Sequence, residues 1–270
     1  LAGDHADEAR SGGIGGVEEL VFDREGVGEG RRAVSRARRV EEGFTGGVEA
    51  ISDAIFVGGR LGFFQLSGGN FAGELEAGTM GTIIYSNPGG IQGNVTSNGN
   101  IDRLVVTNGT IGDGGGGPTV VSAFDRISTV EAWGGLASDG QILAGTPGTT
   151  PGGIERVRVA RGMNGLVEAR SGSLDSVQVY GDMNGGELRA ASSIFNAFVS
   201  GEFIDSDIQA NSLGRVTVNG GLSGTPPLVH EIHADTGSFV AQIRGETFEI
   251  GLGPDQEPEI ISGGVKVSVG

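Results

Sequence analysis

Hydrophobic residues recur along most of the chain about every 20 residues, and each recurrence follows a glycine-containing turn. We call the first hydrophobic position of each repeat the first anchor. The first anchors are Phe71, Ile91, Ile111, Leu136, Met163, Met183, Phe203, Leu222 and Phe248. The longer intervals between them contain one ordinary repeat and an insertion. This spacing, with short apolar segments and no helix-length apolar stripe, predicts a solenoid whose repeats bury their apolar residues against one another.

A second hydrophobic position, the second anchor, follows in each repeat. The second anchors are Met80, Ile101, Phe124, Ile154, Leu174, Ile194, Leu213 and Phe239. Small or branched apolar residues follow most of them three and five positions later, as Val177 and Val179 follow Leu174. This alternation predicts a strand with one inward face, and the step of three indicates a corner before it. Glycines before the first anchors, such as Gly162 and Gly221, supply the positive φ angles that corners require.

The pattern predicts an all-β protein, a parallel β-helix (β-solenoid) of about nine to ten coils of about 20 residues each. The general handedness of parallel crossovers favours right-handed winding. We expect this domain to occupy residues 54–270. Residues 1–53 lack the repeat and are rich in arginine and acidic side chains, which favours a poorly structured segment, either disordered or forming a loose cap. A stretch that is not native coding sequence would have a similar composition.

Composition and charge narrow the classes of partner. Glycine accounts for 54 of 270 residues without the period of three found in collagen, so it marks turns. The formal net charge of −16 disfavours nucleic acid as a partner, because binding to phosphates needs basic residues. The chain has no cysteine, which excludes disulfides and cysteine-bound zinc. Its apolar runs are too short to predict a membrane span.

Two features of the repeat resemble known proteins. Units such as residues 163–182, MNGLVEARSGSLDSVQVYGD, and residues 203–221 resemble the coils of parallel β-helix proteins of the pectate-lyase-like superfamily. The richness in glycine, asparagine, serine and valine resembles repetitive bacterial surface and secreted proteins. The resemblance covers residues 60–270 and implies an extracellular or cell-surface location. It also implies that polysaccharide lyases and hydrolases are to be weighed, because the superfamily includes them.

Charged residues follow the second anchors in several repeats. The first position after the anchor is acidic at Asp102, Asp125, Glu155 and Asp175, and the second is basic at Arg103, Arg126, Arg156 and Arg215. Stacked carboxylates repel, so we expect the arginines to neutralise them in a solvated ladder. Calcium on the carboxylates is the alternative, although the arginines disfavour it. We therefore expect no cofactor, with Ca²⁺ as the alternative.

Two neighbouring repeats carry insertions, at residues 112–123 and 138–153. Both fall before a second anchor, so we expect both to project from the same edge and to form the walls of a groove. The chain's one tryptophan lies nearby in sequence, together with acidic residues suited to a sugar. The candidate ligand-binding residues are Trp133, Asp113, Asp125, Glu131 and Asp139. In the alternative interpretation, Trp133 caps the core beneath the glycine-rich loops.

The sequence contains a candidate metal site in the insertion after Leu222. In an extended strand Glu231, His233 and Asp235 share one face, whereas His230 points the other way. These side chains are a candidate divalent-metal or acid–base trio. Such a trio also arises by chance in a polar strand, and the spacing differs from the helical zinc motif.

The last residues form an alternating strand through Val265, Val267 and Val269. No polar cap follows this strand, so its edge would be open to pairing with further coils or another molecule. End-to-end self-association is therefore one expected mode of interaction.

The leading functional hypothesis is a non-enzymatic structural or adhesive module of a secreted or cell-surface bacterial protein, with polysaccharide or other surface proteins as partners. The plain outward strand positions, the regular repeat and the acidic charge favour it. The alternative is a polysaccharide-active enzyme or carbohydrate-binding module that uses the groove between the two insertions. Ice binding would need threonines aligned from coil to coil, and they are not aligned.

Overall fold

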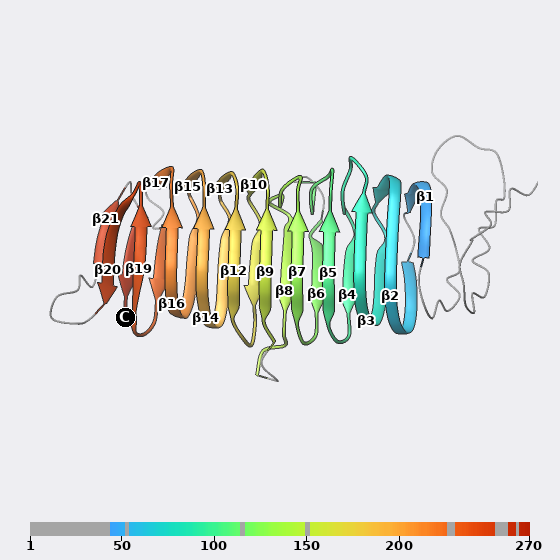
Figure 1. The fold of residues 1–270 in the computed structure, drawn as a ribbon, viewed down its shortest axis with the longest axis horizontal. Helices are drawn as coiled ribbons and strands as arrows, with labels where there is room; N and C mark the ends of the chain where they lie inside the picture. Colours follow the sequence, from blue (N-terminus) through green and yellow to red (C-terminus); the bar gives the residue numbers. More distant parts are fainter. Residues whose placement is uncertain are drawn as a thin grey trace, which may run out of the picture.

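The computed structural model describes residues 44–51, 54–113, 117–148, 152–225, 230–251, 259–262 and 265–270. They form a parallel β-solenoid of about eight turns with about 21 residues per turn. Figure 1 shows the turns stacked side by side along one long axis. The expected all-β solenoid is confirmed, with fewer turns than the nine to ten expected. The described part of the chain contains no helix that could cross a bilayer.

Each turn has three faces, which we number in the order in which the chain follows them from each first anchor. Face 1 is short and consists of single bridges at Phe71, Ile91, Ile111 and Leu136, followed by β10 (Gly162–Met163), β13 (Asp182–Asn184), β15 (Glu202–Ile204) and β17 (Gly221–Ser223). Face 2 contains the first parts of β2 (Ala54–Phe71), β3 (Glu74–Ser86), β14 (Glu187–Val199) and β16 (Asp207–Val218), together with β4 (Asn94–Ser97), β6 (Thr119–Ala123), β8 (Gly140–Ala144), β11 (Leu166–Ala169), β18 (His230–Ala234) and β22 (Val265–Val269).

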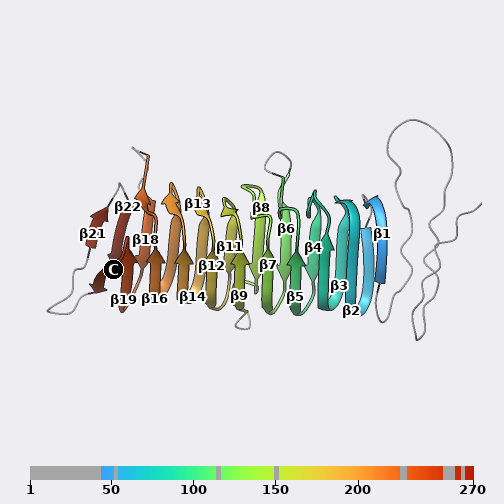
Figure 2. The ribbon, with the colours of Figure 1, turned by 45° about the horizontal axis from the view of Figure 1, so that its top comes forward.

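Face 3 contains the later parts of the four long strands. Between them lie β5 (Ile101–Val106), β7 (Ile127–Ala132), β9 (Ile154–Val159) and β12 (Leu174–Val179), and after them β19 (Ser238–Ile243) and β20 (Glu246–Gly251). Figure 2 shows face 2, from β4 to β11, and face 3, from β5 to β12, as two rows of neighbouring strands. The remaining strands are β1 (Phe44–Ile51) and β21 (Glu259–Ser262). β1 pairs in parallel with the end of β2, so strand pairing begins within the segment expected to be a loose cap. Residues 1–43 of that segment lie outside the described residues.

The anchors occupy equivalent positions in successive turns. The first anchors from Phe71 to Leu222 pair in register along face 1, and each is at most 6% exposed. The second anchors Met80, Ile101, Ile154, Leu174, Ile194 and Leu213 are likewise buried on face 3. Successive turns contribute apolar side chains at the same depth, so they form one continuous core along the axis.

The second anchor of the turn that contains β7 was predicted wrongly. Ile127, not Phe124, pairs with Ile101 and Ile154, and Phe124 is 48% exposed at the corner. Only Ile127 stands three and five residues before the buried Val130 and Ala132. The alternation along the strand therefore decides which of the two hydrophobic residues is buried.

The first anchor predicted at Phe248 is also wrong, because the chain reverses direction before it. Arg244 and Gly245 have positive φ angles of 51° and 83°, as the two-residue turn of a hairpin requires. β20 consequently pairs antiparallel with β19, and Phe248 lies opposite Ala241.

The edge of the last parallel strand is covered. β21 pairs antiparallel with β22, with Ile260 opposite Val267, while β18 pairs with the other edge of β22. The expectation of a bare edge at Val265–Val269 is therefore wrong. The hydrophobic alternation of this strand places Val265, Val267 and Val269 in the core.

Candidate functional site

The two insertions leave the solenoid at different corners. The first lies between Ile111 on face 1 and β6 on face 2, whereas the second lies between β8 on face 2 and β9 on face 3. Much of each predicted loop is in fact strand, because β6 and β8 pair with each other on face 2. The expected groove between the insertions is therefore wrong.

The acidic residues predicted to surround the ligand lie at separate places. Asp113 and Asp139 meet at the corner between faces 1 and 2, where the Asp113 N–H donates to Asp139 Oδ2 at 3.3 Å. Asp125 lies at the corner between faces 2 and 3, where its N–H donates to the Gly99 oxygen at 3.1 Å. Glu131 lies on face 3, with its Oε2 3.3 Å from Arg103 Nη2. The structure therefore places Asp113 and Asp139 at one corner and the other two acidic residues elsewhere.

Trp133 lies at the corner between faces 3 and 1, directly after β7. The backbone N–H of Trp133 donates to the Val106 backbone oxygen at 2.9 Å and thereby extends the hydrogen-bond ladder of face 3 by one residue. The indole is 49% exposed, so it does not cap the core. Its position in the ladder identifies which residues of the following turns lie beside it.

A second exposed aromatic ring lies two turns further along the same corner. The Ala160 N–H donates to the Ala132 oxygen at 3.0 Å, and the Tyr180 N–H donates to the Val159 oxygen at 2.8 Å. Trp133, Ala160 and Tyr180 therefore hold the same position in three successive turns. Since paired strands are about 4.8 Å apart, the backbone positions of the two aromatic residues are about 10 Å apart. Between the two aromatic residues, this position holds only the short side chain of Ala160.

A row of outward side chains, three polar and one aromatic, lies beside these rings on face 3. Glu131, Arg158, Gln178 and Phe198 pair in register in consecutive turns. Gln178 Oε1 accepts hydrogen bonds from Arg158 Nε at 3.3 Å and from the Tyr180 hydroxyl at 2.8 Å. The rings of Tyr180 and Phe198 meet edge to face, with their centroids 6.3 Å apart. We call the group Trp133, Arg158, Gln178, Tyr180 and Phe198 the aromatic edge.

Face 3 is basic near the aromatic edge although the whole chain is acidic. The two outward columns of its described strands contain four arginines and two carboxylates: Arg103, Arg156, Arg158 and Arg215, with Glu131 near the aromatic edge and Glu249 on β20. Glu131 is already paired with Arg103. No described residue forms an ion pair with Arg156 or Arg215, and both are exposed. Sequence reasoning missed this surface because the residues that form it are separated by whole turns.

The carboxylates of face 3 gather at its far corner, where it meets face 2. There Arg126 Nη1 lies 2.6 Å from Glu155 Oε1, and Arg60 Nη2 lies 3.9 Å from Asp102 Oδ2. Of the arginines predicted to neutralise the ladder, Arg126 pairs with a ladder carboxylate, Glu155, as expected, whereas Arg103 pairs with Glu131. The ladder itself is interrupted because the turn of Ile127 has Ser128 and Thr129 at those positions. Partial burial, and then the charge of Glu155, raise the pKa of Asp175.

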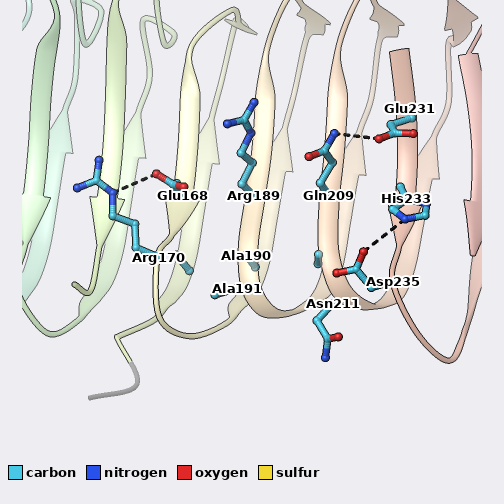
Figure 3. A pocket seen from close by; sticks show the side chains of 12 residues that line it. Glu168, Arg170, Arg189, Ala190, Ala191, Gln209, Asn211, Glu231, His233 and Asp235 are labelled. Atoms are coloured by element: carbon cyan, nitrogen blue, oxygen red, sulfur yellow. Dashed lines mark hydrogen bonds and ion pairs between the residues drawn. The ribbon is translucent and has the colours of Figure 1, made fainter. Parts of the chain in front are cut away.

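The predicted metal trio lies in a shallow depression of about 470 Å³ on face 2. Figure 3 shows Glu168 and Arg170 at one end and His233 and Asp235 at the other, with Ala190 and Ala191 between them. Glu231, His233 and Asp235 do point outward together (Figure 3), and His233 Nε2 lies 3.4 Å from Asp235 Oδ1, whereas Glu231 has a different partner. Gln209 donates to Glu231 Oε1 at 3.0 Å, and His233 Nδ1 lies 2.9 Å from Ser268 Oγ. Among the described residues no group of three such side chains is arranged to hold a metal ion.

His230 points the other way, as expected, and is 8% exposed. Its Nε2 lies 3.5 Å from Asp205 Oδ1, and its Nδ1 lies 3.7 Å from Asp207 Oδ2. Two hydrogen bonds from Thr225, through its hydroxyl and its N–H, lower the pKa of Asp205, with a smaller contribution from His230. Neither ring nitrogen of this buried histidine makes a hydrogen bond to a described residue.

Comparison of the chain with protein-family models, with curated proteins and with solved structures finds no match. The solenoid is shown by the structure, whereas membership of the pectate-lyase-like superfamily stays a prediction. Function is therefore inferred from the geometry of the three faces.

Proposed function

We propose that the protein is a non-enzymatic structural and adhesive module, a stiff rod that holds a binding surface at the cell surface or in a secreted assembly. The observation that carries this proposal is the unbroken register of the first anchors from Phe71 to Leu222. Every turn in that range is joined to its neighbours by backbone hydrogen bonds and by buried side chains. Bending such a rod would separate strands on one face, so the stack resists bending.

The outward charges also suit a structural role. Arg103 with Glu131, and Arg126 with Glu155, join residues of neighbouring turns at 3.3 Å and 2.6 Å. Each exposed pair contributes little to stability, about 0 to 1 kcal/mol, but together they neutralise charges that would repel along the axis. Glu131 and Glu155 are thus engaged in contacts between turns.

A polysaccharide-active enzyme is the alternative from the sequence, and the site proposed for it was the groove between the insertions. Because the insertions leave at different corners, that alternative loses its site. Carbohydrate binding without cleavage keeps a specific observation in its favour, namely the half-exposed Trp133 aligned with Tyr180.

Two measurements test the proposal. Small-angle X-ray scattering should give the profile of a rigid rod, and incubation with a panel of polysaccharides followed by mass spectrometry should show no new products. Cleavage products that appear with the protein and disappear after its heat denaturation would contradict the non-enzymatic role. A flexible or globular scattering profile would contradict the stiff rod.

A further inference from the structure

We propose that the aromatic edge binds an extended, β-1,4-linked anionic polysaccharide that lies along the axis of the solenoid. The proposal rests on the adhesive role above and assigns its ligand. It uses Trp133, Arg158, Gln178 and Tyr180, which come from three consecutive turns.

The spacing of the exposed rings indicates the shape of the ligand. Trp133 and Tyr180 hold the same position two turns apart, about 10 Å along the axis. In an extended β-1,4-linked chain each sugar is turned over relative to the one before it, so the same face of the ring recurs at every second sugar. The length of two such sugars is close to the separation of the two aromatic residues. Both rings can therefore stack on alternate sugars of one straight chain.

The residue between the two rings leaves room for the intervening sugar. Ala160 has the shortest side chain that still has a Cβ atom, and it holds the corner position of the middle turn. A larger side chain at this position would hold the polysaccharide away from the protein surface. Trp133 is 49% and Tyr180 is 51% exposed, so both rings are accessible without any movement of the backbone.

Two polar residues of the row on face 3, Arg158 and Gln178, supply directed contacts beside the stacking rings. Arg158 lies in the middle turn, one outward position inside the corner, so its guanidinium is next to the intervening sugar. Gln178 Oε1 accepts hydrogen bonds from Arg158 Nε at 3.3 Å and from the Tyr180 hydroxyl at 2.8 Å. These hydrogen bonds fix both groups before a ligand binds. A guanidinium fixed by one N–H keeps its other N–H donors free for oxygen acceptors.

The charge of the surface indicates an anionic polymer. Arg156 and Arg158 lie in the middle turn, and Arg215 lies further along the same face, whereas Glu131 is neutralised by Arg103. The other faces contain most of the acidic side chains, but screening at about 0.15 M salt confines each charge to about 8 Å. A carboxylate or sulfate on the sugar therefore experiences the nearby arginines more strongly than the net charge of the chain. Planar guanidinium groups bind both of these anions with paired hydrogen bonds.

The proposal is tested with three polymers that share one β-1,4-glucan backbone: neutral hydroxyethylcellulose, carboxymethylcellulose and cellulose sulfate. Titration calorimetry of the full chain at about 0.15 M NaCl should show at least one anionic polymer binding about tenfold more tightly than the neutral one. Trp133→Ala and Tyr180→Ala should each weaken that binding about tenfold, the effect expected when one stacked ring is lost. Arg158→Gln should remove the preference for the anionic polymer.

Matched controls distinguish binding at the aromatic edge from non-specific binding to other exposed aromatic and basic side chains. Phe195 is 57% exposed at the corner between faces 2 and 3, and Arg170 lies at the same corner beside the face 2 depression. Phe195→Ala and Arg170→Ala should leave affinity within about twofold of the original. Thermal unfolding of each variant checks that the fold is retained.

Several outcomes would overturn the proposal. They are the absence of binding to both anionic polymers, an equal loss in Phe195→Ala, and a retained anionic preference in Arg158→Gln. Light scattering provides a further outcome: a dimer that Trp133→Ala dissociates, without polymer binding, would identify a second copy of the chain as the occupant. Binding without cleavage supports this proposal and the non-enzymatic role together, whereas loss of binding leaves the scattering test of the rod unaffected. Preference for one anionic polymer over the other identifies the ligand's charged group as carboxylate or sulfate.

Discussion

At the scale of single residues, side-chain size at each corner decides how closely the turns approach. Ala169, Ala190 and Ala210 stack in register where face 2 ends, so that corner has a narrow interior. At the corner before face 1, a Cβ atom on Gly181 would overlap the backbone oxygen of Arg161 in the turn before it. The glycines and alanines are therefore set by contact between turns, in addition to the turn geometry that the sequence suggested.

A pH prediction also belongs to this scale. Asp175 has a pKa raised above its ordinary value of 3.8, first by partial burial and then by the charge of Glu155. The ionised carboxylate therefore destabilises the folded state, and this cost disappears as the pH falls through the raised pKa and the group is protonated. We expect Asp175→Asn to raise the free energy of unfolding at pH 7 by less than about 0.5 kcal/mol, because solvent screens the charge.

Urea denaturation of both proteins between pH 3 and pH 8 measures this effect, and the difference should vanish below about pH 4. Asp102→Asn is the matched control, since Asp102 Oδ2 lies 3.9 Å from Arg60 and should not gain stability on neutralisation. A destabilised Asp175→Asn variant at pH 7 would contradict the assigned cause.

At the scale of elements, the last strands change from parallel stacking to antiparallel pairing. β20 turns back along β19, and β21 turns back along β22. Glu246 and Glu249 lie on β20, and Glu259 lies on β21, so charged residues occupy the terminal strands. Charges on such edges are a common protection against pairing with another chain.

The protection of β22 by β21 can be tested with a double variant, Ile260→Pro with Ile261→Pro. Two consecutive residues in a strand direct their N–H groups to opposite sides. Replacing both with proline therefore removes a hydrogen bond to β22, whichever of the two residues donates it. The edge of Val265–Val269 should then be open, and concentration-dependent association should increase. Size-exclusion chromatography with light scattering measures it.

Ile261→Thr is the control, because the Ile261 side chain is 72% exposed and its replacement keeps the backbone donors. It should behave as the unaltered chain does. Equal association of the control and the proline variant would show that loss of the Ile261 side chain, and not the opened strand edge, is responsible.

At the scale of the whole molecule, the stack tolerates insertions because they leave the core at corners. The backbone Cα of Gly152 lies within 3.1 Å of the position that a Cβ on Gly145 would take, so the second insertion leaves and returns at nearly one point. The turns on either side cross the same corner with fewer residues, from Ala123 to Ile127 and from Ala169 to Leu174. The insertion is therefore not needed to close the turn.

Removal of residues 146–151, with Gly145 joined directly to Gly152, should preserve the solenoid. We expect the melting temperature to change by less than about 4 °C, the shift of roughly 1 kcal/mol in a chain of this size. Circular dichroism and thermal unfolding measure the result. As a control, removal of six residues from within β9 and the loop after it should prevent folding, because it deletes core positions such as Val157.

The periodicity of the sequence was sufficient to predict the all-β solenoid, the first anchors as far as Leu222 and most second anchors. The physical reason is that each turn buries side chains at the same depth, so burial repeats in the sequence wherever the turns repeat. The 20-residue hydrophobic repeat predicted the wrong anchor where strand alternation or a hairpin turn determined the structure instead. Phe124 satisfied the hydrophobic pattern but not the alternation with Val130, and Phe248 followed a two-residue hairpin turn.

The tertiary structure alone decided which outward side chains meet. Trp133 and Tyr180 became neighbours through hydrogen bonds of the intervening turn, and the two insertions were separated because each corner has its own length in residues. Outward positions are not constrained by the core, and the residues at the position of Trp133, Ala160 and Tyr180 show no period that a sequence reading can follow. The sequence thus determined the scaffold, because burial repeats, and the structure determined the aromatic edge, because register between turns assigns a surface residue its neighbours.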